Sequence, residues 1–313
     1  MGIKYLNRFL QENCKESIRK VNLYELSGKK VVIDTSIYMY RYLGEEALLE
    51  NIYLMINILR LNNIIPLFVF DGKPPKEKED LLRERKQNKK KAEEKYNELK
   101  NQLIDGQNAK IEEQMNQLKK EFIRLHHTDI KDVKLLIQSL GASYIEAPGE
   151  ADKLCAKLVN KNLVYACLSE DMDMFVYGCK RVLRYLSLLN KTAIMYEMKD
   201  ILIELDMNFN DFKNICIISG TDYNIHNNND LTNTLKYFKK YRKSKEKKNN
   251  FLSWLEENTD YINGLEVREI SKLFNIDDVP EFKNCLKTKI LNGPINISNL
   301  KTILEKADFI FVN

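Results

Sequence analysis

Histidine is scarce in this chain of 313 residues, with His126, His127 and His226 the three present. This scarcity argues against catalysis by a histidine-activated nucleophile and against a histidine-built zinc centre. The cysteines are scattered and none forms a C-x-x-C pair, which argues against a disulfide framework or a cysteine-built zinc site. We therefore expect reduced thiols at Cys14, Cys155, Cys167, Cys179, Cys216 and Cys285.

Long apolar runs are also missing. The longest clear run, Ile64–Phe70, is far too short to cross a bilayer. Asn7, Gln11 and Glu12 interrupt the opening segment, so the sequence predicts no secretory signal. We expect a soluble intracellular protein, and both a nucleus and a viral replication site are compatible settings.

The composition leaves room for a large hydrophobic core, because 44% of the residues are apolar. The length fits one large domain or two. Charged residues make up 30% of the chain, but the net charge is only +5. Where the charges lie is therefore more informative about partners than their sum.

Apolar segments that end in aspartate are the main pattern. The segments are 30–33 before Asp34, 64–70 before Asp71, and 163–168 before Asp171 and Asp173. Helical patterns over 35–43, 47–61 and 129–139 separate these expected strands, and 143–146 reads as a further short strand. Alternating strands and helices predict a mostly parallel sheet, in which strand ends of one polarity share an edge. The aspartates would then converge and repel unless a metal ion or protons intervene.

Three further acids belong to the same pattern. Glu150 and Asp152 begin an expected helix, where acids also favour the helix dipole, and Asp222 follows an expected helical or extended segment at 212–219. Oxygen-only ligands select Mg²⁺ or Mn²⁺ over zinc. Two such ions about 4 Å apart can clamp a phosphodiester. The residues alone predict metal-dependent phosphoryl transfer on nucleic acid.

Two segments are strongly basic. Residues 73–91 hold nine Lys or Arg against four Asp or Glu, and 236–248 hold eight against one with Tyr237, Phe238 and Tyr241 interleaved. The first segment opens an expected pair of helices interrupted near Asp105-Gly106; it reads either as a solvated hairpin or as a lid that contacts phosphate. The second suits a nucleic-acid backbone, with a solvated helix end as the alternative.

The remaining segments carry less information. Residues 1–27 are expected to form a short helix and a loop, Arg181–Ser187 and Thr192–Glu197 a hairpin, and 251–313 short amphipathic helices.

The motifs MGI, VVIDTSIYMY, FVFDGKPP, EAPGEAD, SEDMDMFVYG and GTDY occur in an order that resembles the flap endonuclease branch of the structure-specific 5′ nuclease (XPG-like) family, over residues 1–225. The resemblance implies an α/β, PIN-like fold with a mostly parallel central sheet flanked by helices. It implies a nuclease core at 1–225, a basic helical arch inserted at 72–128 and a helical, DNA-binding C-terminal region at 226–313. It also implies a monomer that hydrolyses DNA near junctions of duplex and 5′ flap, in replication or repair.

Individual residues take roles from this resemblance. By motif position, Asp34, Asp71 and Glu150 would bind one Mg²⁺ and Asp171, Asp173 and Asp222 a second, with Asp152 between them and Mn²⁺ as a substitute ion. The family usually has Glu where Asp152 stands, so this ligand reaches one methylene less far. Lys78 and Arg85 would contact the scissile phosphate, with plain surface charge as the alternative. Tyr40 would stack on a base, with a helix-core tyrosine as the alternative, and Gly2 would lie near the active site.

Two departures from the family pattern matter. The family follows GxDY with a Gly-Ile-Gly turn that holds a potassium ion against duplex DNA, whereas residues 224–230 contain no glycine. A potassium site is therefore not predicted, and our hypothesis is that Lys239, Lys240, Arg242 and Lys243 contact the duplex instead. The final residues, LEKADFIFVN, lack the family's glutamine-led, double-aromatic box, so we predict no sliding-clamp contact through this tail.

Other functions remain open at this point. A 5′-to-3′ exonuclease of the same family would share these motifs, as would a bubble or junction cutter. A non-catalytic DNA-binding homologue would be expected to have lost some of the acids. A small-molecule phosphatase is disfavoured, because Ser36 stands where a D-x-D motif starting at Asp34 needs its second acid.

Overall fold

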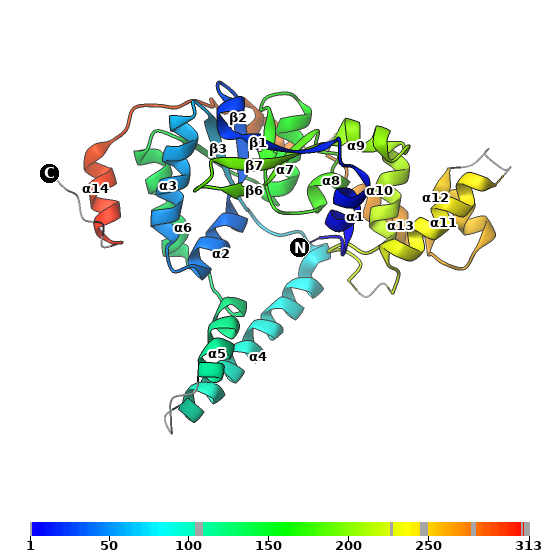
Figure 1. Ribbon diagram of the computed structural model, residues 1–313, viewed down its shortest axis with the longest axis horizontal. Helices are drawn as coiled ribbons and strands as arrows, with labels where there is room; N and C mark the ends of the chain where they lie inside the picture. Colours follow the sequence, from blue (N-terminus) through cyan, green and yellow to red (C-terminus); the bar gives the residue numbers. More distant parts are fainter. Residues whose placement is uncertain are drawn as a thin grey trace.

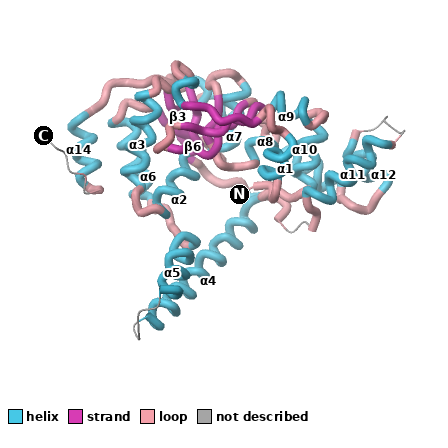
Figure 2. The backbone as a smooth tube through the Cα atoms, in the orientation of Figure 1, coloured by secondary structure: helices cyan, strands magenta, loops and turns pink. Residues whose placement is uncertain are grey.

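The computed structural model describes residues 2–103, 109–225, 228–244, 250–276, 280–307 and 309. A seven-stranded sheet lies in the middle, in the order β1-β7-β6-β5-β2-β3-β4, with helices on both sides (Figures 1 and 2). Strands β2 (Lys30–Asp34), β3 (Ile65–Phe70), β4 (Ser143–Glu146), β5 (Ala166–Leu168) and β6 (Arg181–Ser187) run parallel. The predicted mostly parallel α/β sheet is confirmed.

The other strands form an antiparallel edge. The predicted hairpin is β6 with β7 (Thr192–Glu197), and β7 also pairs with β1 (Ile18–Asn22). We had predicted a loop at β1. Arg19, Lys20 and Asn22 are exposed and polar, whereas Val21 is buried and Ile18 half-buried, as suits an edge strand. The apolar run that marks buried strands is therefore missing. Strand β5 is also shorter than the predicted 163–168.

The two faces of the sheet bury separate hydrophobic cores. Along β2, Val32 packs in one core, whereas Val31 and Ile33 pack in the other, as the alternation of a strand requires. The first core lies with α1 (Leu6–Asn13), α7 (Ala151–Asn160), α8 (Asp173–Val176), α9 (Met198–Glu204) and α10 (Phe209–Ile218). The second lies with α2 (Thr35–Gly44), α3 (Leu48–Leu61), α6 (His127–Ser139) and α14 (Ile297–Glu305). The sheet edge that carries the strand-end acids is thus fixed from both sides.

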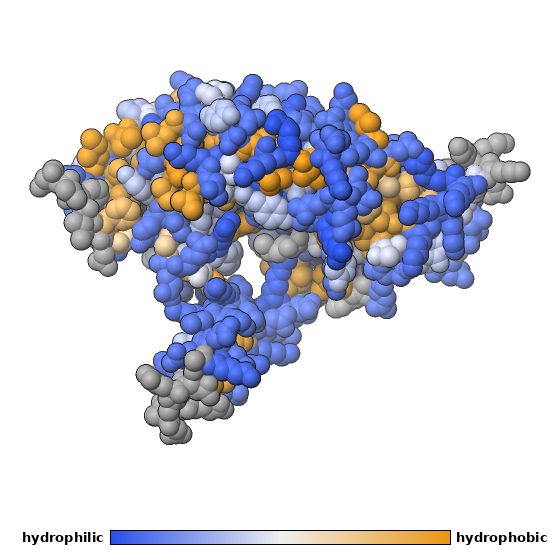
Figure 3. Space-filling view, viewed as in Figure 1, coloured by the Kyte–Doolittle hydropathy of each residue, from blue (hydrophilic) through white to orange (hydrophobic). Residues whose placement is uncertain are grey.

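The predicted arch projects from the body as two helices side by side, α4 (Glu79–Leu103) and α5 (Ala109–Glu121), after the short helix η2 (Lys76–Lys78) (Figure 1). The predicted interruption at Asp105-Gly106 lies outside the described residues. Tyr96 and Phe122 pack edge to face with ring centroids 5.3 Å apart, and Lys119 pairs with Glu46 on the turn between α2 and α3. The described surface of the arch is mostly hydrophilic (Figure 3).

The C-terminal region begins with α11 (Leu231–Lys243), α12 (Phe251–Asn258) and α13 (Gly264–Leu273). The aromatic residues of α11 pack inward: the ring centroids of Phe238 and Phe251 lie 5.1 Å apart, and those of Tyr241 and Trp254 lie 5.8 Å apart. The aromatic interleaving that we had linked to nucleic acid therefore serves the core of this region, while the lysines of α11 stay exposed.

The chain then returns to the central sheet, through η3 (Pro280–Lys283), η4 (Cys285–Lys287) and a connection to α14 that we call the strap (residues 288–296). Gly141 and Gly293 meet backbone to backbone: a Cβ on Gly141, whose φ is +69°, would lie 2.3 Å from the carbonyl oxygen of Gly293. The Asn296 amide donates to the Ser139 carbonyl at 2.7 Å. Helix α14 packs on α6.

Two further predictions concern regions that the structure describes in part. Of the C-terminal tail, 308 and 310–313 lie outside the described residues, so the predicted lack of a sliding-clamp contact stays a prediction. Within the described part of the chain, no helix is long and apolar enough to cross a membrane.

Removing the buried side chain of Leu304 should destabilise the protein. Leu304 lies on α14 and is fully buried in the second core. Leu304→Ala should therefore lower the free energy of unfolding by about 3 kcal/mol. Ile297, on the same helix, is 65% exposed, and Ile297→Ala should change it by less than about 0.5 kcal/mol. Urea unfolding measures both. Equal stability of the two variants would show that α14 does not hold the core.

Candidate active site

The predicted acids meet at the carboxyl edge of the parallel strands. Ile33 of β2 pairs with Phe68 of β3 and with Leu168 of β5. Asp34 is the next residue of β2, so it lies beside the ends of the two strands that lead to Asp71 and to the SEDMD loop (residues 169–173). The sequence pattern predicted this convergence, and the register produces it.

Helix α7 brings its own acids to the same edge. The Asp71 carboxylate accepts the backbone amide of Ala151 at 2.8 Å, which holds the start of α7 against the end of β3. Glu150 is the N-cap residue of this helix and Asp152 lies in its first turn. Asp222 follows α10 and lies close enough to Asp173 to raise the pKa of that carboxyl.

A serine links three of the acids. Ser169 donates its hydroxyl to Asp34 Oδ2 at 3.0 Å and accepts the Asp171 amide at 3.1 Å. Asp171 Oδ1 in turn accepts the Asp173 amide at 3.0 Å. Sequence reasoning missed Ser169 as a site residue, although it lies inside the SEDMD motif, because its hydroxyl gains this role only when β2 and β5 pair.

Burial and like charge act together on three of these carboxyls. Burial raises the pKa of Asp34, Asp152 and Asp173 well above the ordinary value. The next cause in each case is a neighbouring acid: Asp71 beside Asp34, Glu150 beside Asp152, and Asp171 beside Asp173. The acids therefore lie close enough to repel one another.

Two cations from the base of the arch enter this cluster. Lys78 is only 7% exposed, and its Nζ lies 2.5 Å from Glu150 Oε1 and 3.8 Å from Asp222 Oδ2. Burial alone would lower the pKa of Lys78, but Asp152 and Glu150 outweigh it and raise this pKa above its ordinary value. Arg85 donates to Asp222 Oδ2 at 2.9 Å. The alternative of a surface charge does not hold for Lys78.

Tyr223 contacts both Glu150 and Lys78. Its hydroxyl donates to Glu150 Oε2 at 2.7 Å, and Lys78 Nζ lies 4.8 Å from the centre of its ring. The ring packs edge to face on Phe274, with centroids 5.3 Å apart. Tyr223 lies within the GTDY motif, but the sequence alone predicted no role for it.

Tyr40 and Gly2 border the cluster. Tyr40 is 42% exposed and Lys89 Nζ lies 5.0 Å from its ring centre, while Tyr38 and Tyr42 of the same helix are buried. The helix-core alternative therefore fits its two neighbours and not Tyr40. Gly2 has a φ of +76°, and a Cβ there would lie 2.7 Å from Asp173 Oδ1 and 2.8 Å from Asp171 Oδ1. Only glycine lets the backbone approach these carboxylates so closely.

The chemistry of this cluster suits a hard divalent cation. All the charged ligands are carboxylates, and both carboxylate oxygens of Asp173 are buried without a hydrogen-bond partner among the described residues. No group of three or more acidic, histidine or cysteine side chains in the described ranges is already gathered closely enough to hold a metal ion. The acids are not gathered more closely because Glu150 and Asp222 form ion pairs with Lys78 and Arg85 instead.

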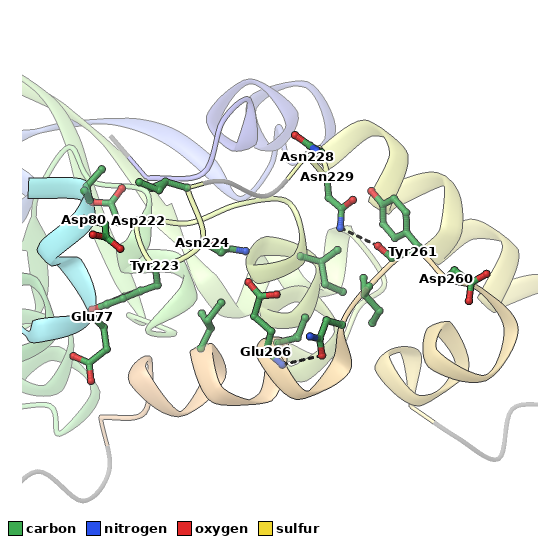
Figure 4. A pocket seen from close by; sticks show the side chains of 17 residues that line it. Glu77, Asp80, Asp222, Tyr223, Asn224, Asn228, Asn229, Asp260, Tyr261 and Glu266 are labelled. Atoms are coloured by element: carbon green, nitrogen blue, oxygen red, sulfur yellow. Dashed lines mark hydrogen bonds between the residues drawn. The ribbon is translucent and has the colours of Figure 1, made fainter. Parts of the chain in front are cut away.

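A cavity of about 650 Å³ adjoins the site (Figure 4). It lies between the arch base, with Glu77 and Asp80, the connection from α10 to α11, and α13, with Glu266. Asn229 donates to the Tyr261 carbonyl at 3.1 Å within it. Residues 226 and 227 of this connection lie outside the described part of the chain. The acidic and amide lining does not favour a phosphate here.

The basic residues of α11 lie apart from the carboxylates, at the end of the molecule beyond α10 and α13 (Figure 1). Lys239, Lys240 and Lys243 are exposed. Arg242 instead donates to the Asp206 carbonyl at 2.8 Å and pairs with the Asp206 carboxylate. The structure thus brings Lys78, Arg85 and Gly2 to the acids, with Tyr40 at the margin, but not the α11 residues.

Comparison with known proteins adds family evidence. Residues 1–92 match the XPG N-terminal domain and residues 141–222 match the XPG I-region. Flap endonuclease 1 of Meyerozyma guilliermondii is 32% identical, over 83% of this chain and 72% of that protein. Human flap endonuclease 1 is 31% identical, over 71% of this chain and 62% of that protein. The chain thus spans somewhat over three fifths of the human relative's length.

Solved structures share the fold. The flap endonuclease-1 of Methanococcus jannaschii superposes with a TM-score of 0.63 at 24% identity, covering 99% of this chain and 94% of that one. The catalytic core of Rad2 in complex with DNA substrate gives 0.66 at 21% identity, covering 97% and 94%. Since matched domains, curated relatives and the arrangement of acids agree, the chain belongs to the XPG-like nuclease family, in its flap endonuclease branch.

Proposed function

We propose that this protein is a structure-specific 5′ nuclease that hydrolyses DNA phosphodiesters near junctions of duplex and 5′ flap. The observation that supports this most is the convergence of seven acids from distant parts of the chain with two cations from the arch base. The acids are Asp34, Asp71, Glu150, Asp152, Asp171, Asp173 and Asp222. The relatives named flap endonuclease 1 support the same reaction class, and a 5′-to-3′ exonuclease is the alternative within the family.

We propose Mg²⁺ as the cofactor, with Mn²⁺ as a substitute. Asp34, Asp71 and Glu150 would hold one ion, Asp171, Asp173 and Asp222 a second, and Asp152 would lie between them. The partnerless oxygens of Asp173 support a cation at this position. A GEN1 structure with the same fold is described as a complex with product DNA and Mg²⁺. When bound, two such ions would activate a water molecule and stabilise the leaving oxygen.

The protein's own residues would bind and orient the substrate. Lys78 and Arg85 would exchange their carboxylate partners for the scissile phosphate, since both already carry their charge at the edge of the cluster. The ring of Tyr40 is 42% exposed and would stack on a base. Gly2 would leave room for the phosphodiester beside Asp171 and Asp173, because it places no side chain there.

We propose that residues 1–225 form the nuclease core, with 72–128 as the arch past which a 5′ flap travels, and that α11 to α13 contact the duplex. Lys236, Lys239, Lys240 and Lys243 recur at the spacing of one helical face, opposite buried Phe238. Such a face can follow a phosphate backbone. The strap and α14 lie against the nuclease core instead.

Asp171→Ala should abolish cleavage and preserve DNA binding, because Asp171 lies at the centre of the acid cluster and not on a basic surface. The assay uses Mg²⁺ with end-labelled flap, nicked, bubble and four-way DNA side by side, which also separates flap cutting from exonuclease activity. Asp200→Ala, an exposed acid in the first turn of α9, is the matched control and should cut normally. Normal cleavage by Asp171→Ala would refute the proposed function.

Neutralising the α11 lysines should weaken DNA binding in a salt-dependent way. The triple variant Lys239→Gln, Lys240→Gln, Lys243→Gln should reduce the slope of log affinity against log salt by about 3, one for each lost phosphate contact. Arg242→Gln should have a smaller effect, since Arg242 is already paired with Asp206. A triple variant at the exposed residues Lys20, Lys30 and Lys191 controls for net charge. Equal slopes for the two triple variants would count against an α11 contact.

Lys78→Met should destabilise the metal-free protein. The change removes a buried cation from between Glu150 and Asp222 and leaves their charges unbalanced, so the free energy of unfolding should fall by about 3 kcal/mol. Arg83→Met is the control, because Arg83 lies exposed on α4 and pairs only with Glu79 and Asp80 in the described structure. Thermal unfolding without and with Mg²⁺ tests this: Mg²⁺ should restore more stability to Lys78→Met than to Arg83→Met.

A further inference from the structure

Arg184 is a buried cation that has no role in the proposed chemistry. Arg184 lies on β6 and is only 5% exposed. An arginine is rarely buried so deeply unless other groups take up its charge and its donors. Its contacts therefore indicate what it holds together.

The first set of contacts is with the SEDMD loop. Arg184 Nη2 donates to the main-chain carbonyl of Glu170 at 2.9 Å, and its Nε lies 3.5 Å from Glu170 Oε2. The other carboxylate oxygen of Glu170 accepts the amide of Tyr185 at 2.6 Å. Glu170, which stands between Ser169 and Asp171, is therefore held at both its main chain and its side chain.

The second set of contacts is with the N-terminal segment. Arg184 Nη1 donates to Asn7 Oδ1, which also accepts the hydroxyl of Tyr196 at 3.0 Å. The side-chain amide of Asn7 donates to the hydroxyl of Tyr185 at 2.7 Å. Asn7 belongs to α1, a few residues after Gly2, whose backbone lies against Asp171 and Asp173. One guanidinium thus joins the two segments that border these carboxylates.

We propose that Arg184 is a positioning residue that fixes Asp171, Asp173 and the segment after Gly2 relative to one another. This inference rests on the proposed metal-dependent nuclease function. From Glu170 the restraint passes along the hydrogen bonds that join Asp171, Ser169 and Asp34, and from Asp171 to the amide of Asp173. If Arg184 is lost, the acids remain present but lose their common geometry.

The chemistry of arginine suits this task and that of lysine does not. The planar guanidinium directs Nη1 to Asn7 and Nη2 to Glu170 at the same time, whereas an ammonium group is a single point on a flexible stem. Arg184 also lies against two aromatic rings, with its Cζ 4.9 Å from the ring centre of Tyr185 and 5.7 Å from that of Tyr196. These contacts fix its plane.

The test is Mn²⁺ binding to the full chain without DNA, measured by calorimetry or electron paramagnetic resonance. Arg184→Gln should weaken Mn²⁺ binding about 10-fold, the size typical of losing a residue that orients metal ligands. Arg184→Lys should recover part of the lost affinity, because lysine keeps the positive charge near Glu170 but cannot direct two N–H groups to Asn7 and Glu170 at once. Arg181→Gln is the matched control: Arg181 lies on the same strand, pairs with Glu197 at 3.3 Å, and should leave the affinity unchanged.

A second variant keeps the inference testable if Arg184→Gln does not fold. Asn7→Ala should weaken Mn²⁺ binding about 3-fold, and adding it to Arg184→Lys should cost less than the sum of the single effects, because both act through one contact. Unchanged Mn²⁺ affinity in folded Arg184→Gln or in Asn7→Ala, with only a lower melting temperature, would overturn the positioning role and leave the proposed function standing. A wild-type chain that binds no Mn²⁺ would instead overturn the proposed function, and this inference with it.

Discussion

Repulsion among buried carboxylates is the constraint on which this structure depends. Asp34, Asp152 and Asp173 lie where water cannot screen their charge, and each faces another acid. They stay there because β2, α7 and α8 are held by hydrophobic cores on the two faces of the sheet. The free energy of core packing thus maintains a charge arrangement that the side chains alone would avoid.

The negative charge of these acids also holds the base of the arch against the sheet, because it attracts two cations there. Lys78 ends η2 and Arg85 lies in the second turn of α4. The ion pairs described between the arch base and the acids are therefore made by side chains at the start of the arch. In the proposed function, a cation or phosphate that enters the cluster competes with these pairs. The position of the arch base and the occupancy of the site are then coupled by charge.

Much of this could be predicted from the sequence, because every acid of the site except Asp222 follows an apolar strand or begins a helix. The strands ending at Asp34 and Asp71 and the hairpin at 181–197 were recognisable from local pattern alone. Strand β1 was missed because an edge strand needs little apolar sequence. The orientation of Tyr237, Phe238 and Tyr241 was also missed, since their spacing does not tell which face of α11 is covered.

The site residues that escaped prediction share one physical property: their role depends on partners far away in the chain. Ser169 acts on Asp34 across paired strands, and Tyr223 meets Glu150 only after α10 docks. Arg184 looks like an ordinary strand residue until Asn7 and Glu170 approach it. No local spacing encodes such meetings.

The close approach of Gly141 and Gly293 has a consequence for how the chain matures. Leu291 of the strap meets Ser143 of β4 across 148 residues of sequence, and α14 packs on α6. During synthesis, β4 is therefore made well before the strap, and this edge of the sheet stays uncovered until the strap has been made. A chain interrupted before residue 293 would leave that edge bare.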